Sequence, residues 1–215
     1  MAFFVTFEGV EGSGKTTQIR RLKRYLKQRG VACFTTREPG GTPIGEKVRK
    51  ILLNRAHGEM TALGELFLYE AARAQHVSQV IRPLLNRRGV ILCDRFSDAS
   101  IAYQGHGRKI DPGLVDLLNQ VASKGVRPDL TFLLDCPSHM GLKRALRRDR
   151  QKRSNRQDRF EREKIQFHHR VRKGYLSLAR EEPQRIKVID TREGEEKVFE
   201  KIRKTVDGLM GFKKI

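Results

Sequence analysis

The sequence predicts an α/β fold, a doubly wound five-stranded parallel sheet with helices on both faces. Short apolar segments alternate along the chain with longer segments of helical periodicity. Each predicted strand is almost entirely apolar, which is typical of parallel strands covered by helices on both sides. No internal repeat and no Pro/Ser-rich linker divides the 215 residues. We therefore expect a single domain spanning 1–215.

The predicted strands and helices alternate from one end of the chain to the other. Apolar runs predict strands at 3–7, 31–36, 90–93, 130–134 and 186–189. Helical periodicity covers 15–28, 43–54, 61–87, 114–122, 139–149, 160–181 and 194–209. The one low-complexity stretch, 147–159, is too polar to pack in a core and predicts a solvated loop.

Composition excludes several classes of protein. Hydrophobic residues make up 38% of the chain and charged residues 33%, which argues against wholesale disorder. No apolar run approaches the roughly 20 residues of a membrane-spanning helix, and the early Glu8 argues against a signal peptide. Cys33, Cys93 and Cys136 are too few and too far apart for a disulfide framework or a paired-cysteine zinc site. We expect a cytoplasmic protein with no membrane partner.

The net charge of +20 is the unusual feature of the composition. Such an excess of Lys and Arg predicts polyanionic partners, which include nucleotides, nucleic acid and acidic membrane surfaces. Segment 143–162 is the local maximum, with ten basic and three acidic residues. Charge alone does not choose among these partners.

A glycine-rich loop indicates nucleotide chemistry. The segment Gly9-Val10-Glu11-Gly12-Ser13-Gly14-Lys15-Thr16 fits the phosphate-binding pattern G-x-x-x-x-G-K-[ST], with a predicted strand before it and a helix after it. Glycines allow the backbone N–H groups to point at phosphate oxygens, and the helix N-terminus favours negative charge. Lys15 is expected to reach the β- and γ-phosphates and the Thr16 hydroxyl to bind Mg²⁺. The sequence thus predicts binding of a nucleoside triphosphate.

Three further segments bear on the fate of the γ-phosphoryl group. The third strand ends in Asp94-Arg95, where the carboxylate suits a metal and the guanidinium suits a second phosphate. The second strand ends in the polar loop 37–42 on the same sheet edge. Tyr69 and Arg73 are four residues apart in a predicted helix and so share one face. An aromatic ring and a guanidinium there could stack on a base and hydrogen-bond to it, although a core tyrosine beside a solvated arginine is the simpler interpretation.

Six motifs in order resemble the thymidylate kinase family, P-loop nucleoside monophosphate kinases that transfer phosphate from ATP to dTMP. The likeness runs from Phe3 to the final predicted helix, in the family's order. Its motifs are FEGVEGSGKTT at 7–17, REPGGT at 37–42, ARAQH at 72–76, DRFSDASIAYQG at 94–105, RPDLT at 127–131 and DRFE at 158–161.

This resemblance implies roles for individual residues. The phosphate loop from Gly9 to Thr17, with Val10, Glu11, Gly12, Ser13, Gly14, Lys15 and Thr16, would bind ATP. Thr16 and Asp94 would hold Mg²⁺, and Arg95 would hold the acceptor phosphate. Tyr69 takes the place of the aromatic residue that stacks on thymine, which is usually Phe in the family. The remaining acceptor residues implied are Arg73 at the base and phosphate, Tyr103 under the deoxyribose, Ser100 and Gln104 lining the pocket, and Glu38, Pro39 and Glu161 at its border.

The basic stretch resembles the family's lid, at about 143–161. One branch of the family places the arginine that contacts the transferred phosphate in the phosphate loop, and the other places it in the lid. Position 11 is Glu, followed by Gly12, so the chain resembles the lid-arginine branch. Arg148 is the first candidate, followed by Arg153 and Arg150, because an arginine that arrives on closure supplies charge where it develops. This lid is about six residues longer than in bacterial relatives.

Alternatives from other classes remain open at this point. A broader pyrimidine monophosphate kinase is the nearest one, and a nucleic-acid-binding P-loop NTPase would use the basic surface as its footprint. Segment 143–162 holds a single aromatic residue, Phe160, which argues against stacking of single-stranded nucleic acid. A non-catalytic nucleotide-binding scaffold is disfavoured by the presence of Lys15, Thr16, Asp94 and Arg95. The resemblance implies a homodimer, for which we expect helix 61–87 to supply the surface.

Overall fold

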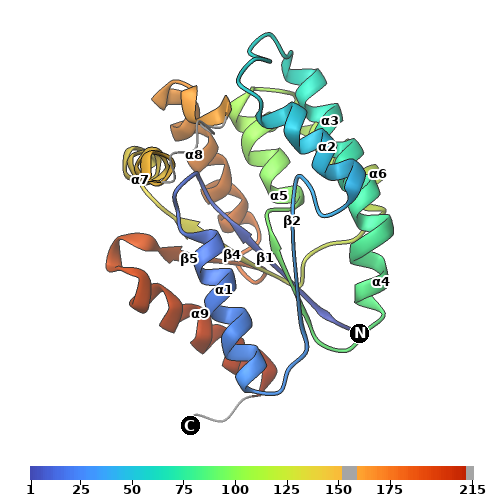
Figure 1. The fold of residues 1–215 in the computed structure, drawn as a ribbon, viewed down its shortest axis with the longest axis vertical. Helices are drawn as coiled ribbons and strands as arrows, with labels where there is room; N and C mark the ends of the chain where they lie inside the picture. Colours follow the sequence, from blue (N-terminus) through green and yellow to red (C-terminus); the bar gives the residue numbers. More distant parts are fainter. Residues whose placement is uncertain (152–158, 212–215) are drawn as a thin grey trace.

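The computed structural model describes residues 1–151 and 159–211, with the backbone alone described for 148–151. Its described residues form a five-stranded, fully parallel sheet in the order β2-β3-β1-β4-β5. The strands are β1 (Phe3–Glu8), β2 (Cys33–Arg37), β3 (Val90–Asp94), β4 (Leu130–Asp135) and β5 (Ile186–Asp190). All five lie where apolar runs predicted them, so the α/β fold class is confirmed (Figure 1).

Helices cover both faces of this sheet. On one face, α1 (Lys15–Gln28) and α9 (Glu195–Met210) pack against the alternate strand residues Val5, Phe7 and Leu92. On the other face, α8 (Ile165–Glu181) packs on β4 and β5, and residues 77–85, which include α4 (Arg82–Leu85), pack on β1 and β3. Four further helices pack around these: α2 (Pro43–Leu53), α3 (Ala62–His76), α5 (Ser97–Ser100) and α6 (Pro112–Ser123). Because side chains alternate along a strand, Glu8 lies on the same face as Phe4 and Thr6, toward α5 and α8.

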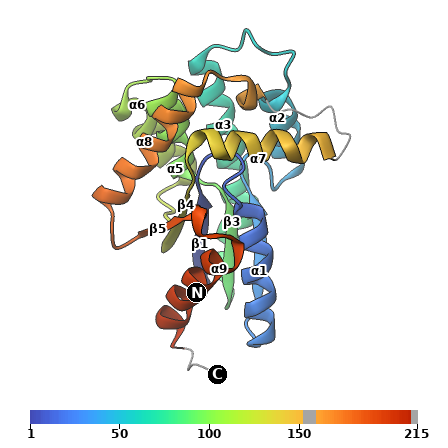
Figure 2. The ribbon, with the colours of Figure 1, turned by 90° about the vertical axis from the view of Figure 1, so that its left-hand side faces the viewer.

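The carboxyl ends of the strands converge under one helix. Chain order changes sides at β1, since β3 lies on one side of it and β4 on the other. In open α/β sheets, ligands bind in the crevice at such a point. The helix α7 (Ser138–Gln151) crosses these strand ends (Figure 2). The described part of the expected lid therefore lies next to the crevice.

Three helical segments differ from the sequence prediction. The helix expected at 61–87 divides into α3, the π-helical turn η1 (Val77–Ile81) and α4. The helix expected from 160 begins only at Ile165, after the short 3-10 helix η3 (Arg159–Arg162), because Lys164 is extended with ψ 147°. Residues 97–107, for which no helix was predicted, form α5 and the π-helical segment η2 (Ile101–Gly107).

The segment η2 is held in place by α8. A Cβ on Gly107 would lie 2.7 Å from the Phe167 ring, and one on Gly174 would lie 2.7 Å from His106. Glycine at both positions permits this close approach of two helices. The result brings Tyr103 and Gln104, on η2, to the edge of the crevice. Among the described helices, none combines the length and the apolar character needed to cross a membrane.

Candidate active site

The phosphate loop lies between β1 and α1. Gly9, Gly12 and Gly14 have φ values of 134°, 69° and 98°, a conformation that side chains other than glycine rarely adopt. A Cβ on Gly12 would lie 2.0 Å from the carbonyl oxygen of Gly141 in α7. The loop and the helix that leads into the lid are therefore in direct backbone contact.

Lys15, the first residue of α1, folds over this loop. Its Nζ donates to the carbonyl oxygens of Gly9 at 2.9 Å and Val10 at 3.0 Å. Burial, together with the positive charge of Arg95, lowers the pKa of Lys15 to about 8. The ammonium group is thus held by carbonyl oxygens at the place where the motif predicts phosphate oxygens.

Thr16, in the first turn of α1, meets Asp94 at the carboxyl end of β3. Phe7 of β1 is in register with Asp94 of β3, which brings the end of β3 beside the start of α1. The Thr16 hydroxyl donates to Asp94 Oδ2 at 3.0 Å. A hydroxyl and a carboxylate are the hard oxygen ligands that Mg²⁺ prefers, with its remaining positions filled by phosphates and water. No cluster of three or more His, Cys, Asp or Glu that could hold a metal occurs in the described residues. The pair therefore fits a metal shared with a bound nucleotide.

Arg95 follows Asp94 with a φ of 74°, which is unusual for a residue other than glycine. Its Nη2 donates to Glu11 Oε1 at 3.1 Å, and its Nη1 donates to the Tyr175 hydroxyl at 3.1 Å. Its guanidinium lies 4.8 Å from the centre of the Tyr103 ring. The backbone conformation thus turns Arg95 toward the phosphate loop.

The carboxylate of Glu11 connects the phosphate loop with η2 and α8. It accepts from Tyr103 at 2.6 Å as well as from Arg95, and His168 Nδ1 lies 3.5 Å from its other oxygen, an ion-pair distance. Burial would raise the pKa of Glu11, but His168 and the positive charges of Arg95 and Lys15 outweigh burial and hold that pKa well below its usual range. Glu11 is therefore an anion placed between Arg95 and Lys15, two residues predicted to bind phosphates.

A small cavity of about 60 Å³ opens beside Glu11. It brings together most of the residues implied as acceptor contacts, namely Glu38, Pro39, Tyr69, Arg95, Tyr103 and Gln104. Arg49, Leu53, Ala99 and Phe160 complete the lining. Its volume is well below the roughly 300 Å³ of common small-molecule sites. Binding of a nucleotide here therefore requires the lining side chains to move apart.

Arg73 lies behind this cavity and does not line it. Its side chain is 1% exposed and is held between Glu38 at 2.8 Å and Glu70 at 2.6 Å. Ser100 Oγ lies 3.1 Å from Nη1, and Asn119 also accepts from Nη1. Ser100, like Arg73, is buried outside the lining residues. Arg73 thus supports Glu38 from behind, and Ser100 contacts Arg73 and Glu70.

A second buried cluster surrounds Glu65. Gln104 donates to its Oε1 at 2.7 Å, and Arg159 donates to its Oε2 at 2.5 Å. Arg159 also donates to the Leu52 carbonyl at 3.1 Å, which ties η3 to α2. Glu161 is buried in η3, next to the lining residue Phe160, but does not itself line the cavity.

Three lid arginines cannot be placed beside the crevice. Arg148 and Arg150 belong to α7, whose side chains are not described from residue 148 onward. Arg153 lies outside the described residues. Their predicted contact with the transferred phosphate stays a prediction.

Sequence reasoning missed the residues that support Arg95 and Glu11 from behind. Glu8, at the end of β1, is fully buried, and Tyr175 and His168 come from α8. The one local signal was the carboxylate of Glu8 at the end of an otherwise apolar strand. The two α8 residues gave no such signal, since each fits an amphipathic helix.

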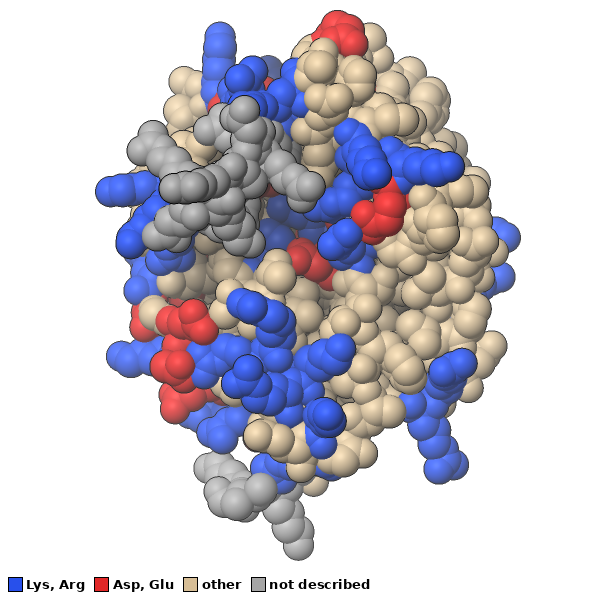
Figure 3. All heavy atoms as spheres, viewed as in Figure 1, with Lys and Arg blue, Asp and Glu red and all other residues tan. Residues whose placement is uncertain are grey.

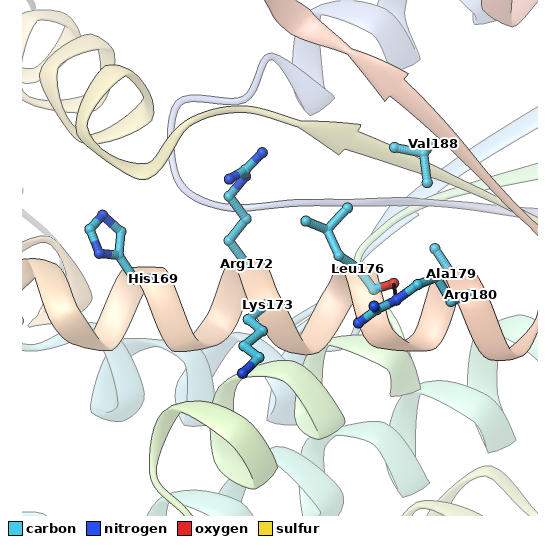
Figure 4. A pocket seen from close by; sticks show the side chains of 7 residues that line it. All are labelled: His169, Arg172, Lys173, Leu176, Ala179, Arg180 and Val188. Carbon is cyan, nitrogen blue, oxygen red and sulfur yellow. Dashed lines mark hydrogen bonds between the residues drawn. The ribbon is translucent and has the colours of Figure 1, made fainter.

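A second cavity, of about 500 Å³, lies away from this crevice. It is formed by the outer face of α8 and by β5, with Arg172, Lys173, Leu176 and Val188 among its lining residues (Figure 4). Arg172 is paired with Asp135, at the end of β4, at 2.7 and 2.8 Å. The smaller cavity, not this one, gathers the residues implied by the sequence.

Comparison with known proteins agrees with the geometry of the crevice. The sequence profile of the thymidylate kinase family matches residues 7–202. A thymidylate kinase of Geobacter sulfurreducens is 52% identical over 196 residues, which cover 91% of this chain and 92% of that protein. One of Geotalea uraniireducens is 52% identical over 194 residues, covering 90% and 91% of the two chains.

A solved structure supports the same assignment. The crystal structure of thymidylate kinase from Ehrlichia chaffeensis superposes with a TM-score of 0.75 at 34% sequence identity. The match covers 96% of this chain and 98% of that one. Fold, motifs and relatives agree along nearly the whole sequence, and the chain belongs to the thymidylate kinase family.

Proposed function

We propose that the protein transfers the γ-phosphoryl group of ATP to dTMP, giving dTDP and ADP, with Mg²⁺ at Thr16 and Asp94. The observation that carries this proposal is the convergence of the phosphate loop and the acceptor cavity at Glu11 and Arg95. A donor and an acceptor site on adjoining strand ends suit in-line transfer between two phosphates. The family relationship supports thymidylate as the acceptor and disfavours the nucleic-acid-binding alternative.

On the donor side, the amides of Gly9 to Thr17 and the Lys15 ammonium would hold the ATP phosphates. Lys15 would exchange its bonds to the Gly9 and Val10 carbonyls for bonds to phosphate oxygens. The hydroxyl of Thr16 and the carboxylate of Asp94 would hold Mg²⁺, which supplies neutralising charge when bound. The acceptor oxygen of dTMP is already anionic, so no catalytic base is required.

On the acceptor side, Arg95 would clamp the dTMP phosphate while Tyr69 stacks on thymine. Tyr103 would lie under the deoxyribose, where a 2′-hydroxyl is crowded, and Gln104, Glu38 and Pro39 would border the base. Arg73 would contribute through Nη2. This nitrogen donates to the Phe96 carbonyl at 3.2 Å, the longest hydrogen bond of the Arg73 side chain among the described residues. A snug pocket around one methyl group discriminates thymine from uracil by only about 1–3 kcal/mol.

The basic stretch at about 143–161 would close over the nucleotides as a lid. Arg148, then Arg153 and Arg150, are the candidates for contact with the transferred phosphate. Their position supports this role, because α7 rests on the phosphate loop at Gly12 and leads directly into that stretch. An arginine brought in by closure supplies charge in the transition state and helps to exclude water.

We further propose a homodimer formed through α3 and its neighbours α2 and α6. Large apolar side chains are exposed on all three helices: Ile44, Ile51, Leu63, Phe67, Leu114, Leu117 and Val121. Lys and Arg are sparse over α3 and α6, at the right of the molecule, whereas they are dense around the crevice (Figure 3). An exposed apolar patch of this kind is typical of an oligomer interface. Val121→Glu should convert a dimer into a monomer in sedimentation experiments.

A cytoplasmic location is part of the same proposal. Cys33, Cys93 and Cys136 are all free thiols, and Cys93 and Cys136 are buried. Unpaired cysteines suit a reducing compartment. ATP and dTMP are also cytoplasmic metabolites.

An ADP-release assay with ATP and Mg²⁺ tests the proposed reaction. The acceptors offered should be dTMP, dUMP, dCMP, dGMP, the ribose analogue of dTMP and single-stranded DNA. We expect turnover led by dTMP and lost in Lys15→Ala and Arg95→Ala. ADP release driven by DNA, with no response to any monophosphate, would contradict the proposal. Removal of Mg²⁺ with a chelator should abolish turnover.

A further inference from the structure

Glu8 is a buried carboxylate that lies outside the lining of the acceptor cavity. It is 0% exposed at the end of β1, directly before the phosphate loop. An isolated carboxylate in such a place is unstable unless it is hydrogen-bonded. Its two oxygens accept one bond each, from the Phe96 amide at 2.7 Å and from the Tyr175 hydroxyl at 2.7 Å.

Both bonds lead to Arg95. The Phe96 amide belongs to the peptide bond that follows Arg95, whose φ of 74° is unfavourable for a side-chain-bearing residue. The Tyr175 hydroxyl donates to Glu8 and accepts from Arg95 Nη1 at 3.1 Å. A single carboxylate therefore fixes the backbone of Arg95 on one side and its guanidinium on the other.

The helix α8 holds Tyr175 in this position. Arg172, one turn earlier, pairs with Asp135 at 2.7 and 2.8 Å and fixes α8 to the end of β4. Tyr175 itself is 2% exposed, and its ring lies 6.2 Å from that of Tyr103. Tyr175 and Glu8 are 167 residues apart in the sequence. Their contact depends on the docking of α8 against the sheet.

We propose that Glu8, acting through Tyr175 and the Phe96 amide, is a positioning residue that aims Arg95 at the acceptor phosphate. This inference rests on the proposed role of Arg95 as the phosphate clamp. Neither Glu8 nor Tyr175 touches substrate in this scheme. The chain Arg95 to Tyr175 to Glu8 runs from donor to acceptor, so the carboxylate orients the tyrosine hydroxyl and the tyrosine oxygen receives the guanidinium.

The surroundings of Glu8 make it an unusual carboxyl group. Burial, together with the nearby carboxylate of Asp98, raises the pKa of Glu8 to about 8, whereas Arg95 opposes that rise. Asp98 is itself paired with Arg185 at 2.7 Å. A carboxylate kept in so unfavourable a place, with its bonds directed at one arginine, is better explained by a site than by stability.

Steady-state kinetics of Tyr175→Phe and Glu8→Gln test the proposal. Tyr175→Phe keeps the ring and removes the hydroxyl, and Glu8→Gln keeps the size and removes one acceptor oxygen. We expect each to lower kcat/KM for dTMP about tenfold, the effect of losing one hydrogen bond to a charged group, with little change in KM for ATP. Lys173→Ala is the matched control, because Lys173 lies on α8, lines the 500 Å³ cavity (Figure 4) and points away from the sheet.

The double variant Arg95→Ala/Tyr175→Phe separates positioning from general loosening of the fold. If Tyr175 acts through Arg95, adding Tyr175→Phe to Arg95→Ala should change kcat/KM by less than about twofold. A further tenfold loss in the Arg95→Ala background, or unchanged dTMP kinetics in both single variants, would overturn the inference. Unchanged dTMP kinetics in Arg95→Ala itself would refute the clamp role of Arg95, and the inference with it.

Discussion

Two arginines predicted to touch the acceptor have different surroundings. Arg73 is 1% exposed and lies between two carboxylates, Glu38 and Glu70. Arg95 is 17% exposed and pairs with one carboxylate, Glu11. Its other side-chain partners among the described residues are a neutral hydroxyl and an aromatic ring. The positive charge of Arg73 thus faces two negative charges from the protein. Arg95 faces one, that of Glu11, which a phosphate can replace as the anionic partner of Arg95.

A sequence motif therefore does not by itself distinguish an arginine that anchors the fold from one that binds a ligand. The ion-pair partners of the arginine distinguish the two roles. An arginine saturated by buried carboxylates cannot leave them without exposing uncompensated charge. An arginine with one exchangeable anion is prepared for another. We therefore expect Arg73 to dominate stability and Arg95 to dominate acceptor recognition.

The largest effect should be on folding, in Arg73→Ala. Removing this side chain leaves Glu38 and Glu70 buried without their shared partner, which costs about 3–5 kcal/mol. Arg95→Ala removes a partly exposed side chain and should cost about 1 kcal/mol. Urea unfolding followed by circular dichroism measures both free energies of unfolding. Equal losses in the two variants would remove the distinction between the arginines.

For catalytic efficiency with dTMP, the larger loss should be in the Arg95 variant and the smaller one in the Arg73 variant. Arg95→Ala removes a preorganised charge from the acceptor phosphate and should lower kcat/KM for dTMP by about 10²–10³. Arg73→Lys retains a positive charge between Glu38 and Glu70, and we expect a smaller loss in a protein that stays folded. Initial rates at saturating ATP give both values. A greater loss in Arg73→Lys than in Arg95→Ala would make Arg73 the main phosphate contact.

A smaller effect is expected when Glu11 is neutralised. In Glu11→Gln the anion that occupies Arg95 and Tyr103 is lost, so dTMP phosphate no longer has to displace it. We expect Kd for dTMP to fall about tenfold, equivalent to one charged hydrogen bond. Isothermal titration calorimetry measures this change, with the exposed Glu193→Gln as control. An unchanged or weaker affinity would show that Glu11 does not compete with the phosphate.

The fold was predictable where its signals were local. All five strands came from short apolar runs, and the phosphate loop, Asp94 and Arg95 came from motifs at strand ends. Residues 97–107 gave no helical signal, because π-helical turns do not follow the 3.6-residue period and two glycines fall within them. That segment depends on packing, with Gly107 against Phe167 and His106 against Gly174.

The support of the site was not predictable for the same reason. Glu8 and Tyr175 meet only after α8 docks on the sheet, and His168 reaches Glu11 by the same docking. Neither contact can be predicted from a single sequence. The buried state of Arg73 was equally hidden, since Tyr69 and Arg73 at a four-residue spacing fit a ligand-facing helix and a core helix alike.

The smallest expected effect concerns the pH dependence of ATP binding. Lys15 has a pKa of about 8, lowered by burial and by Arg95, and Asp94, Glu11 and Glu8 oppose that change. ATP affinity should therefore fall as the pH rises through about 8, where the ammonium loses its proton. Arg95→Ala removes a charge that lowers this pKa, so the fall should move to higher pH. Glu8→Gln removes a charge that raises it, so the fall should move to lower pH.

Glu8 also titrates near pH 8, and its variant identifies the responsible group. If Lys15 is that group, the fall in ATP affinity persists in Glu8→Gln and is absent from Lys15→Met. If the fall vanishes in Glu8→Gln, the carboxylate behind Arg95 controls the donor side as well. Fluorescence titration with a labelled ATP analogue between pH 6 and 10 distinguishes the two. Arg73→Lys keeps the positive charge at its position, so it should leave the midpoint in place and serves as the control for Arg95→Ala.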